Sequence, residues 1–464
     1  MNLRKMSLVF MAIVLLSCFL MARISNSEEN SLTLEECIET ALKNNQGLKI
    51  AEQQLNSAKY SKIQAFGRFF PSLTLTGTYA KLSEVPEIKM ATPQLAYYPP
   101  AAGYVITGYE TSSIGFGGRE SVTSRLSLTQ PVFTGGKIRN SIRQAGYGYE
   151  IAKEEFRRTK NNLIFNVRKA FCSVLLAEIF VEISKEAKEV MQKHYEITQA
   201  LYKEGKVSGY GVSKVKVQLV NSDTSLIKSQ NNLELAKKFL FNLINQRDIE
   251  DRTITGTLEG EIEKPEDLEY YVQGALKNRP EIKQSEYQQK ISKSLVKLAI
   301  AENLPNISLV GNYEYQKPYY FVDEWTGVWS GMVMLNYPIL DGLGISNYGK
   351  IKSAKTIEMQ TEIAKDQLED GIKLEVEKAY LNLTESAERI SAQKENVENA
   401  KENLKIAQER YRLGLMSDIE VRDTQLALTQ AEVNYFQTLY DYKIAQAEIM
   451  KDIGVNPTQG GTLR

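Results

Sequence analysis

Apolar and polar residues alternate in four short stretches of the chain. Two lie in its first half, at about residues 72–80 and 121–131, and two in its second half, at about 306–315 and 328–337. Alternation with a period of two is typical of a β-strand with one apolar and one polar face. The pattern therefore predicts four strands, although a half-buried sheet of a soluble protein would alternate in the same way.

Long polar segments with a helical pattern follow the strands. No proline occurs between about residues 137 and 204, which allows a helix of ~100 Å at about 1.5 Å per residue. Its counterpart, at about 345–412, repeats apolar residues every seven positions: Val376, Leu383, Ile390, Val397, Leu404 and Tyr411. Such heptads predict a coiled coil. The partner positions are mostly small, as at Ala379 and Ala400, so we expect helices that pack around a hollow.

The two halves of the chain are copies of one unit. PSLTLTGTY at 71–79 matches PNISLVGNY at 305–313, and LTQPVFTGG at 128–136 matches LNYPILDGL at 335–343 with a shorter offset. The first copy therefore carries about 27 extra residues, at roughly 82–120. This insertion contains the run Tyr-Tyr-Pro-Pro and is expected to be a loop.

The repeat sets the expected domain boundaries. Residues 28–249 form the first repeat and 266–455 the second, with a linker at 250–265 and a flexible tail at 456–464. Each repeat is expected to run helix, strand, strand, long helix, tight turn, helix. Counting by the repeat, the first long helix places these residues in the same seam as the second: Val167, Val174, Val181, Lys188, Tyr195 and Tyr202.

Residues 1–27 have the pattern of an export signal. Two basic residues precede an apolar run that ends near Met21, and a polar segment follows. This arrangement predicts cleavage after Ser27. The sequence LLSC at 15–18 offers an alternative, because it resembles a lipoprotein processing site with Cys18 as the lipidated residue. No other apolar run approaches the ~18–20 residues of a membrane-spanning helix.

A short glycine-containing break occurs once in each repeat. YKEGKVSGYG at 202–211 returns as YRLGLMSDIE at 411–420. Glycine adopts positive φ without strain, and a following Ser or Asp caps the next helix. We therefore expect tight turns, which we call the first tip (205–208) and the second tip (413–417), capped by Ser208 and by Ser417 or Asp418.

Composition excludes several classes of function. The formal net charge is zero. The chain therefore lacks the surplus of basic residues that would indicate a nucleic-acid partner. His194 is the single histidine and is expected on the solvated surface of a helix, and Cys37 and Cys172 are expected to be buried free thiols. Without a zinc motif, a Cys/His catalytic pair or a phosphate loop, the sequence predicts neither an enzyme nor a cofactor.

Four strands in one chain leave a sheet with two open edges. If the apolar faces meet lipid, open edges are excluded, because no water satisfies the backbone there. The sheet must then close with copies of itself. Two copies give eight strands and a filled interior, whereas three give twelve strands and a lumen. The aromatic residues expected at the membrane interfaces are Tyr79, Tyr313, Tyr315, Tyr319, Tyr320, Trp325, Trp329 and Tyr337.

In these features the chain resembles the TolC family of outer membrane factors. The resemblance rests on the duplication, the PSL and PNI strand entries, the QPVFTGG and YPILDGL strand exits, and the glycine-containing turns. It implies an all-α coiled-coil barrel joined to a membrane β-barrel, as a homotrimer with twelve strands and a long helical tunnel. The implied location is the outer membrane of a Gram-negative bacterium, extending into the periplasm.

The resemblance also implies partners and a passive exit duct for efflux or type I secretion. The partners are a periplasmic adaptor, outer membrane lipid and an inner-membrane transporter, either proton-driven or of the ATP-binding cassette type. The residues of the tips that would dock the adaptor are Gly205, Lys206, Val207, Ser208, Gly414, Leu415, Met416 and Ser417.

Two acidic residues after the second tip lie at positions where, by the resemblance, the family has acidic residues around the closed tunnel mouth. Glu420 and Asp423 are three residues apart and face one side of a helix. Three copies would place six carboxylates around an aperture and favour cations. The first copy has Gly211 and Lys214 at the matching positions, so the ring would come from one hairpin type.

A non-conducting periplasmic coiled-coil scaffold is the alternative function. It explains the heptads but leaves the alternating strands and the aromatic residues without a role. The sequence does not specify the substrate, the pump family or the resting state of the duct.

Overall fold

The computed structural model describes residues 31–99, 103–115, 117–246, 252–320, 322–339 and 344–454. The expected signal peptide, Cys18 and the tail at 456–464 lie outside these residues. The chain forms two compact units. Of the described residues, one unit contains 31–56, 150–246, 252–286 and 363–454 and is almost entirely helical. The other lies within Ser57–Tyr149 and Tyr287–Glu362 and carries the main strands.

The elements follow the predicted order twice. In the first copy they are α2 (Leu34–Asn44), α3 (Gln46–Gly67), β2 (Ser72–Lys81), β3 (Glu87–Tyr98), β4 (Gly103–Gly115), β5 (Glu120–Phe133), α4 (Lys137–Lys203) and α5 (Gly209–Ile244). In the second they are α6 (Leu268–Asn278), α7 (Pro280–Ala301), β7 (Asn306–Lys317), β8 (Thr326–Asn336), α8 (Ile345–Arg412) and α9 (Asp418–Asp452). A short strand precedes each copy: β1 (Ser31–Leu32) the first and β6 (Thr253–Ile254) the second. These two strands pair in parallel.

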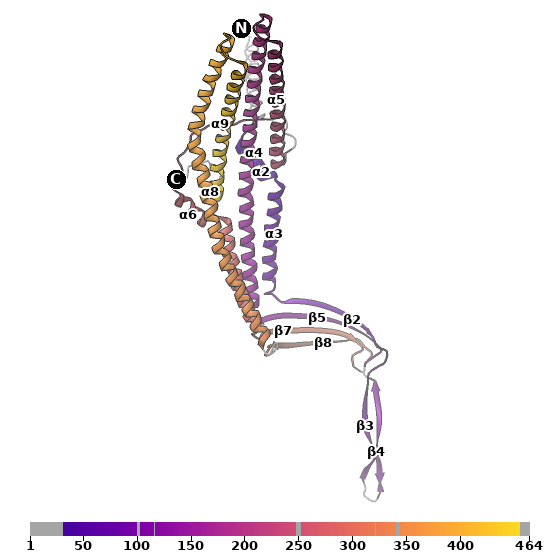
Figure 1. Cartoon of the computed structure of the whole chain (residues 1–464). Helices are drawn as coiled ribbons and strands as arrows, with labels where there is room; N and C mark the ends of the chain where they lie inside the picture. The colour runs from indigo at the N-terminus through magenta and orange to yellow at the C-terminus, as the bar shows by residue number, and fades with distance from the viewer. Residues whose placement is uncertain are drawn as a thin grey trace, which may run out of the picture. The chain divides into compact units, whose positions relative to one another are not determined.

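The main sheet has four antiparallel strands in the order β2-β5-β7-β8 (Figure 1). Its register brings the apolar residues of all four strands onto one face. Leu75 lies opposite Leu126, Leu126 opposite Tyr313, and Tyr313 opposite Trp329. Because opposite residues of neighbouring strands share a face, the period-two pattern of each strand continues across the whole sheet. This apolar face is exposed within one chain, as Leu75 at 74% and Trp329 at 80% show.

The other face of the sheet is polar. Arg125 Nη2 lies 2.9 Å from Glu314 Oε2, and Ser127 Oγ donates to Asn312 Oδ1 at 2.7 Å. Within the described residues, β2 and β8 each pair with one strand only, so both edges of this sheet are open.

The insertion at 82–120 is not a loop, which corrects the expectation from its prolines. Most of it forms the antiparallel hairpin β3–β4, a separate two-stranded sheet. The two strands pair from Glu87 with Gly115 to Tyr98 with Gly103, with one irregularity between Gln94 and Leu95. The physical reason is that cross-strand pairs, such as Ile88 with Ile114, stabilise the two strands. The prolines of the sequence do not reveal these pairs.

The heptad seam of α8 is buried as predicted. Five of the six predicted positions are buried, and Val397 is partly buried. The small partners Ala379, Ala400 and Ala407 are also buried. In α4, Val167 and Val174 are buried, and so are Met191 and Thr198, which correspond by the repeat to Ala400 and Ala407. Ile183 and His194 are buried as well, whereas Val181, Lys188 and Tyr195 of the expected seam are only half-buried. Tyr202, expected in the seam, is 52% exposed, because the two copies are not packed alike at their tip ends.

The two cysteines of the described residues are free thiols, Cys37 buried and Cys172 partly buried. Among the described helices, none combines the length and the apolar character needed to cross a membrane.

Candidate functional site at the helical tips

Both tips have the same backbone design. Gly205 has φ +72° and Gly414 φ +73°, the left-handed conformation that glycine adopts without strain. In the first tip, Lys206 N donates to Leu201 O at 2.9 Å; in the second, Leu415 N donates to Arg410 O at 2.9 Å. These bonds close the preceding helix with a Schellman motif. The local sequence therefore ends α4 and α8 in the same way.

The next helix begins at a serine in each tip. Ser208 Oγ accepts from Gly211 N, and Ser417 Oγ accepts from Glu420 N, so both serines are N-caps. In the second tip the Glu420 carboxylate reaches back to Ser417 N at 2.8 Å, which completes a capping box. Asp418, the alternative cap, is not used as one; its side chain points elsewhere.

The side chains expected to dock an adaptor differ in exposure. Lys206 and Leu415 are exposed, with Leu415 at 75%, whereas Val207 and Met416 are half-buried. Met416 packs against a small cluster formed by Ala407, Tyr411 and Val421. Most of each tip is therefore exposed, and Val207 and Met416 are the parts that pack inward.

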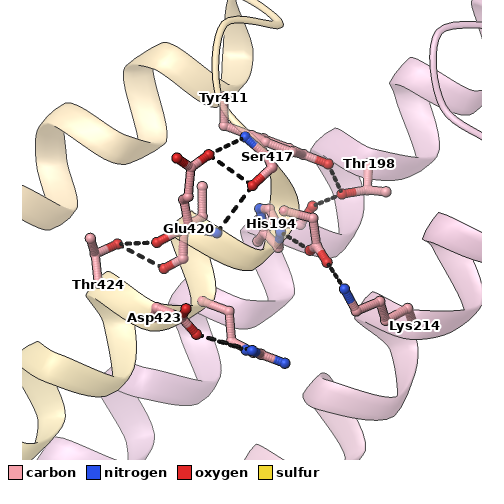
Figure 2. Close-up of polar contacts among 11 residues, drawn as sticks. His194, Thr198, Lys214, Tyr411, Ser417, Glu420, Asp423 and Thr424 are labelled. Carbon is pink, nitrogen blue, oxygen red and sulfur yellow. Dashed lines mark hydrogen bonds and ion pairs between the residues drawn. The ribbon is translucent and has the colours of Figure 1, made fainter.

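His194 is buried at the tip end of α4, which corrects the expectation of a solvated residue. Its side chain is only 6% exposed, and its Nε2 lies 2.9 Å from Asp418 Oδ1 at the start of α9. Lys214 of α5 approaches the same carboxylate, with Nζ 3.2 Å from Oδ2 (Figure 2). A carboxylate that accepts from both neighbours offsets the cost of burying the imidazole.

A second polar contact lies beside the first. Tyr411 OH and Thr198 Oγ1 are 2.9 Å apart, and Thr198 Oγ1 also donates to His194 O at 2.8 Å. The His194 and Tyr411 rings are in contact, with centroids 4.6 Å apart. Burial raises the pKa of Tyr411, while its bond to Thr198 acts against that rise.

We call His194, Thr198, Lys214, Tyr411 and Asp418 the clasp. They come from α4, α5, α8 and α9, so the clasp joins the first helical hairpin of the protomer to the second. Figure 2 shows the labelled side chains of His194, Thr198, Lys214 and Tyr411 converging between the helices. The clasp is the arrangement of this region that sequence reasoning missed.

The two acids of the expected aperture are exposed, and each has a partner within the protomer. The Ser417 amide and then its hydroxyl lower the pKa of Glu420, because both donate to the ionised carboxylate. Asp423 accepts from Arg422 at 3.0 Å. In Figure 2 Glu420 and Asp423 lie along one side of α9. Arg412, at the end of α8, pairs with Glu409 of the same helix at 3.3 Å.

The aromatic residues expected at the membrane interfaces lie on or beside the main sheet. Tyr315 and Trp325 stack with ring centroids 5.0 Å apart, and Tyr319 and Tyr320 are in edge contact. The exposed members include Tyr79, Tyr313, Trp329 and Tyr337. No group of three or more His, Cys, Asp or Glu side chains is arranged to hold a metal ion in the part of the chain that the structure describes.

The comparisons with known proteins agree with this fold. The model of the outer membrane efflux protein family matches residues 37–246 and again 271–455. The probable efflux pump outer membrane protein TtgC of Pseudomonas putida is 22% identical over 418 residues, 86% of this chain and 78% of TtgC. The probable outer membrane lipoprotein SilC of Salmonella typhimurium is 19% identical over 333 residues, 71% of each chain.

Two solved structures have the same fold as this chain. The CmeC outer membrane channel of Campylobacter jejuni has a TM-score of 0.74 at 20% identity, covering 91% of this chain and 85% of CmeC. CusC has a TM-score of 0.74 at 17% identity, covering 91% and 92%. These likenesses, with one family match in each half, confirm the duplicated coiled-coil and strand architecture.

Proposed function

Because the chain belongs to the outer membrane efflux protein family and is a protein of the outer membrane, we propose that it is the exit duct of an efflux system. The observation that carries this proposal is the main sheet: one face is apolar and exposed, the other is polar, and both edges are open. An exposed apolar face next to a polar one suits a wall between lipid and water.

Three copies close this wall. Three sheets of four strands give a twelve-stranded barrel with no open edge, and the polar face with Arg125, Ser127, Asn312 and Glu314 then lines the lumen. The aromatic residues Tyr313 and Trp329 contact lipid. The scaffold alternative leaves the exposed apolar face of the sheet unexplained.

The long hairpins extend into the periplasm and end at the tips. There the tips dock a periplasmic adaptor through the exposed residues beside Gly205 and Gly414, and the adaptor connects the duct to an inner-membrane transporter. The chain itself conducts passively. TtgC is named as part of an efflux pump, which favours efflux over type I secretion.

At the tunnel mouth, Glu420 and Asp423 from three protomers form an acidic ring. Within each protomer the clasp holds the two hairpins together, so opening the mouth requires that the clasp separate or shift. Glu420 accepts from Ser417 and Asp423 accepts from Arg422, and these contacts hold both carboxylates at the tip.

A planar-bilayer experiment tests the acidic ring. We expect Glu420→Ala with Asp423→Ala to lower the preference for cations and to weaken block by multivalent cations. The matched control is Glu395→Ala with Glu398→Ala, a pair of exposed acids with the same spacing on α8. If both double variants leave selectivity unchanged, the ring assignment is wrong. If the wild-type protein inserts no channels and is recovered from cells as a soluble periplasmic monomer, the duct itself is wrong.

A further inference from the structure

The β3–β4 hairpin carries an exposed apolar face on the half that is farther from the main sheet. Opposite residues share this face in three cross-strand pairs: Pro93 with Tyr109, Leu95 with Ile106, and Tyr97 with Tyr104. The rings of Tyr97 and Tyr104 are in edge contact, with centroids 5.6 Å apart. Tyr104 is 71% exposed and Tyr109 69%. We call these six residues the distal face.

A hairpin of this kind is not expected to stand alone. An isolated two-stranded sheet is marginally stable in water, and it needs further strands or a packed apolar face for stability. Within the described residues, β3 and β4 pair only with each other. One copy of the chain leaves the distal face exposed, so a surface that covers it would come from another molecule.

Connectivity places the hairpin at a defined end of the main sheet. β2 ends at Lys81 and β5 begins at Glu120, so the hairpin leaves the sheet at the end opposite to the attachment of α3 and α4. Its base is held by two backbone bonds. Leu82 N donates to Arg119 O and Gly117 N donates to Tyr320 O, both at 2.8 Å. With the helices in the periplasm, this end of the sheet faces the cell exterior.

The chemistry of the distal face fits contact with identical copies of itself. Surfaces that meet around a symmetry axis must not carry like charges, and all six residues of the distal face are uncharged. The nearest charges on the strands lie off this face or closer to the base: Glu110 opposite Thr92, and Lys89 opposite Ser113. Pro93 removes a backbone donor from β3, which favours packing through the face over pairing along the edge.

We propose that the distal faces of three hairpins pack against one another around the threefold axis, forming an apolar collar over the outer end of the duct. This inference rests on the trimer of the proposed function, because only that assembly brings three hairpin bases to one rim. The aromatic side chains of the collar narrow the exit of the duct. The polar residues nearer the base of the hairpin, such as Lys89 and Thr111, line a hydrated space between the barrel and the collar.

Photo-crosslinking in intact cells tests the collar. p-Benzoyl-phenylalanine is placed at Tyr104, and the matched control carries it at Trp329, which is equally exposed but faces lipid in the proposed barrel. We expect chain–chain adducts from position 104 and none from position 329. Adding Leu95→Ser and Ile106→Ser should lower the yield of the position-104 adduct severalfold. The oligomeric state of the wild-type protein in detergent is measured in parallel by native mass spectrometry.

The outcomes separate the collar from the duct. A trimer with chain–chain adducts at position 104 that the serine substitutions reduce supports the collar. A trimer whose position 104 gives no chain–chain adduct, or crosslinks only to lipopolysaccharide or to another protein, overturns the collar and leaves the duct intact. A wild-type protein that is not a trimer overturns both.

Discussion

The bond between Thr198 and Tyr411 gives a ranked prediction for the clasp. Both residues are buried, at 1% and 6% exposure, and their hydroxyls are 2.9 Å apart. Because the Thr198 hydroxyl donates to His194 O, the Tyr411 hydroxyl must donate to Thr198. Thr198→Val therefore leaves a buried donor without an acceptor, at a cost of about 1–3 kcal/mol. Tyr411→Phe removes the donor itself and leaves only an oxygen lone pair unpartnered, at about 0.5–1.5 kcal/mol.

The double variant is the sharpest part of this prediction. Replacing both partners by apolar groups of the same shape is nearly neutral, so Thr198→Val with Tyr411→Phe should lie closer to the wild type than Thr198→Val alone. If the clasp holds the mouth closed, a cost of about 2 kcal/mol in one protomer raises its ratio of open to closed clasps about 30-fold, since about 1.4 kcal/mol is a factor of ten.

Single-channel recordings in planar bilayers measure the effect as open probability. The expected order is Thr198→Val, then Tyr411→Phe, then wild type, with the double variant below Thr198→Val. The matched control is Ser173→Ala, which removes one partner of a similar hydroxyl–hydroxyl contact of 3.1 Å between α4 and α9 away from the tips. The role of the clasp in closure is refuted if the double variant has a higher open probability than Thr198→Val. It is also refuted if the control variant raises the open probability as much as Thr198→Val does.

Three further predictions concern the helical unit. Gly414→Ala should destabilise the second tip by about 1–2 kcal/mol, because the φ of Gly414 is +73°. Gly371→Ala, inside α8 and with open space around it, should instead stabilise that helix by about 1 kcal/mol. Thermal unfolding in detergent compares the two variants. The lowered pKa of Glu420 means that its cap stabilises the tip above the ordinary value of 4.5 and that this contribution is lost as pH falls through the lowered pKa. The protection of the tip amides against hydrogen exchange, taken relative to their intrinsic exchange rates, should therefore fall in acid, and Glu420→Gln should abolish that pH dependence of the protection. Burial raises the pKa of Cys37 to about 12, so iodoacetamide at pH 8 should label it only after denaturation.

The repeating patterns of the sequence were sufficient for the regular elements and for the tips. The strands could be predicted because each one repeats its own period of two, and their faces agree across the sheet. The tips could be predicted because glycine and serine act within a few residues, so Gly205 and Gly414 end their helices in the same way. The role of the tips, of the acids and of the aromatic residues remains a proposal.

The clasp and the hairpin were decided by tertiary structure. His194 looked solvated because its neighbours in sequence are polar, but α9 brings Asp418 to it from 224 residues away. The burial of His194 in place of Tyr195 in the α4 seam has the same cause, since the partner helix selects which positions are buried. The insertion looked like a loop because its prolines are conspicuous, whereas strand pairing depends on which residue lies opposite. The sequence by itself determines local periodicity, because the residues that set it are neighbours in the chain. The partner that hydrogen-bonds a buried polar group, or that pairs with a strand, is determined only by the tertiary structure, because it comes from a distant segment.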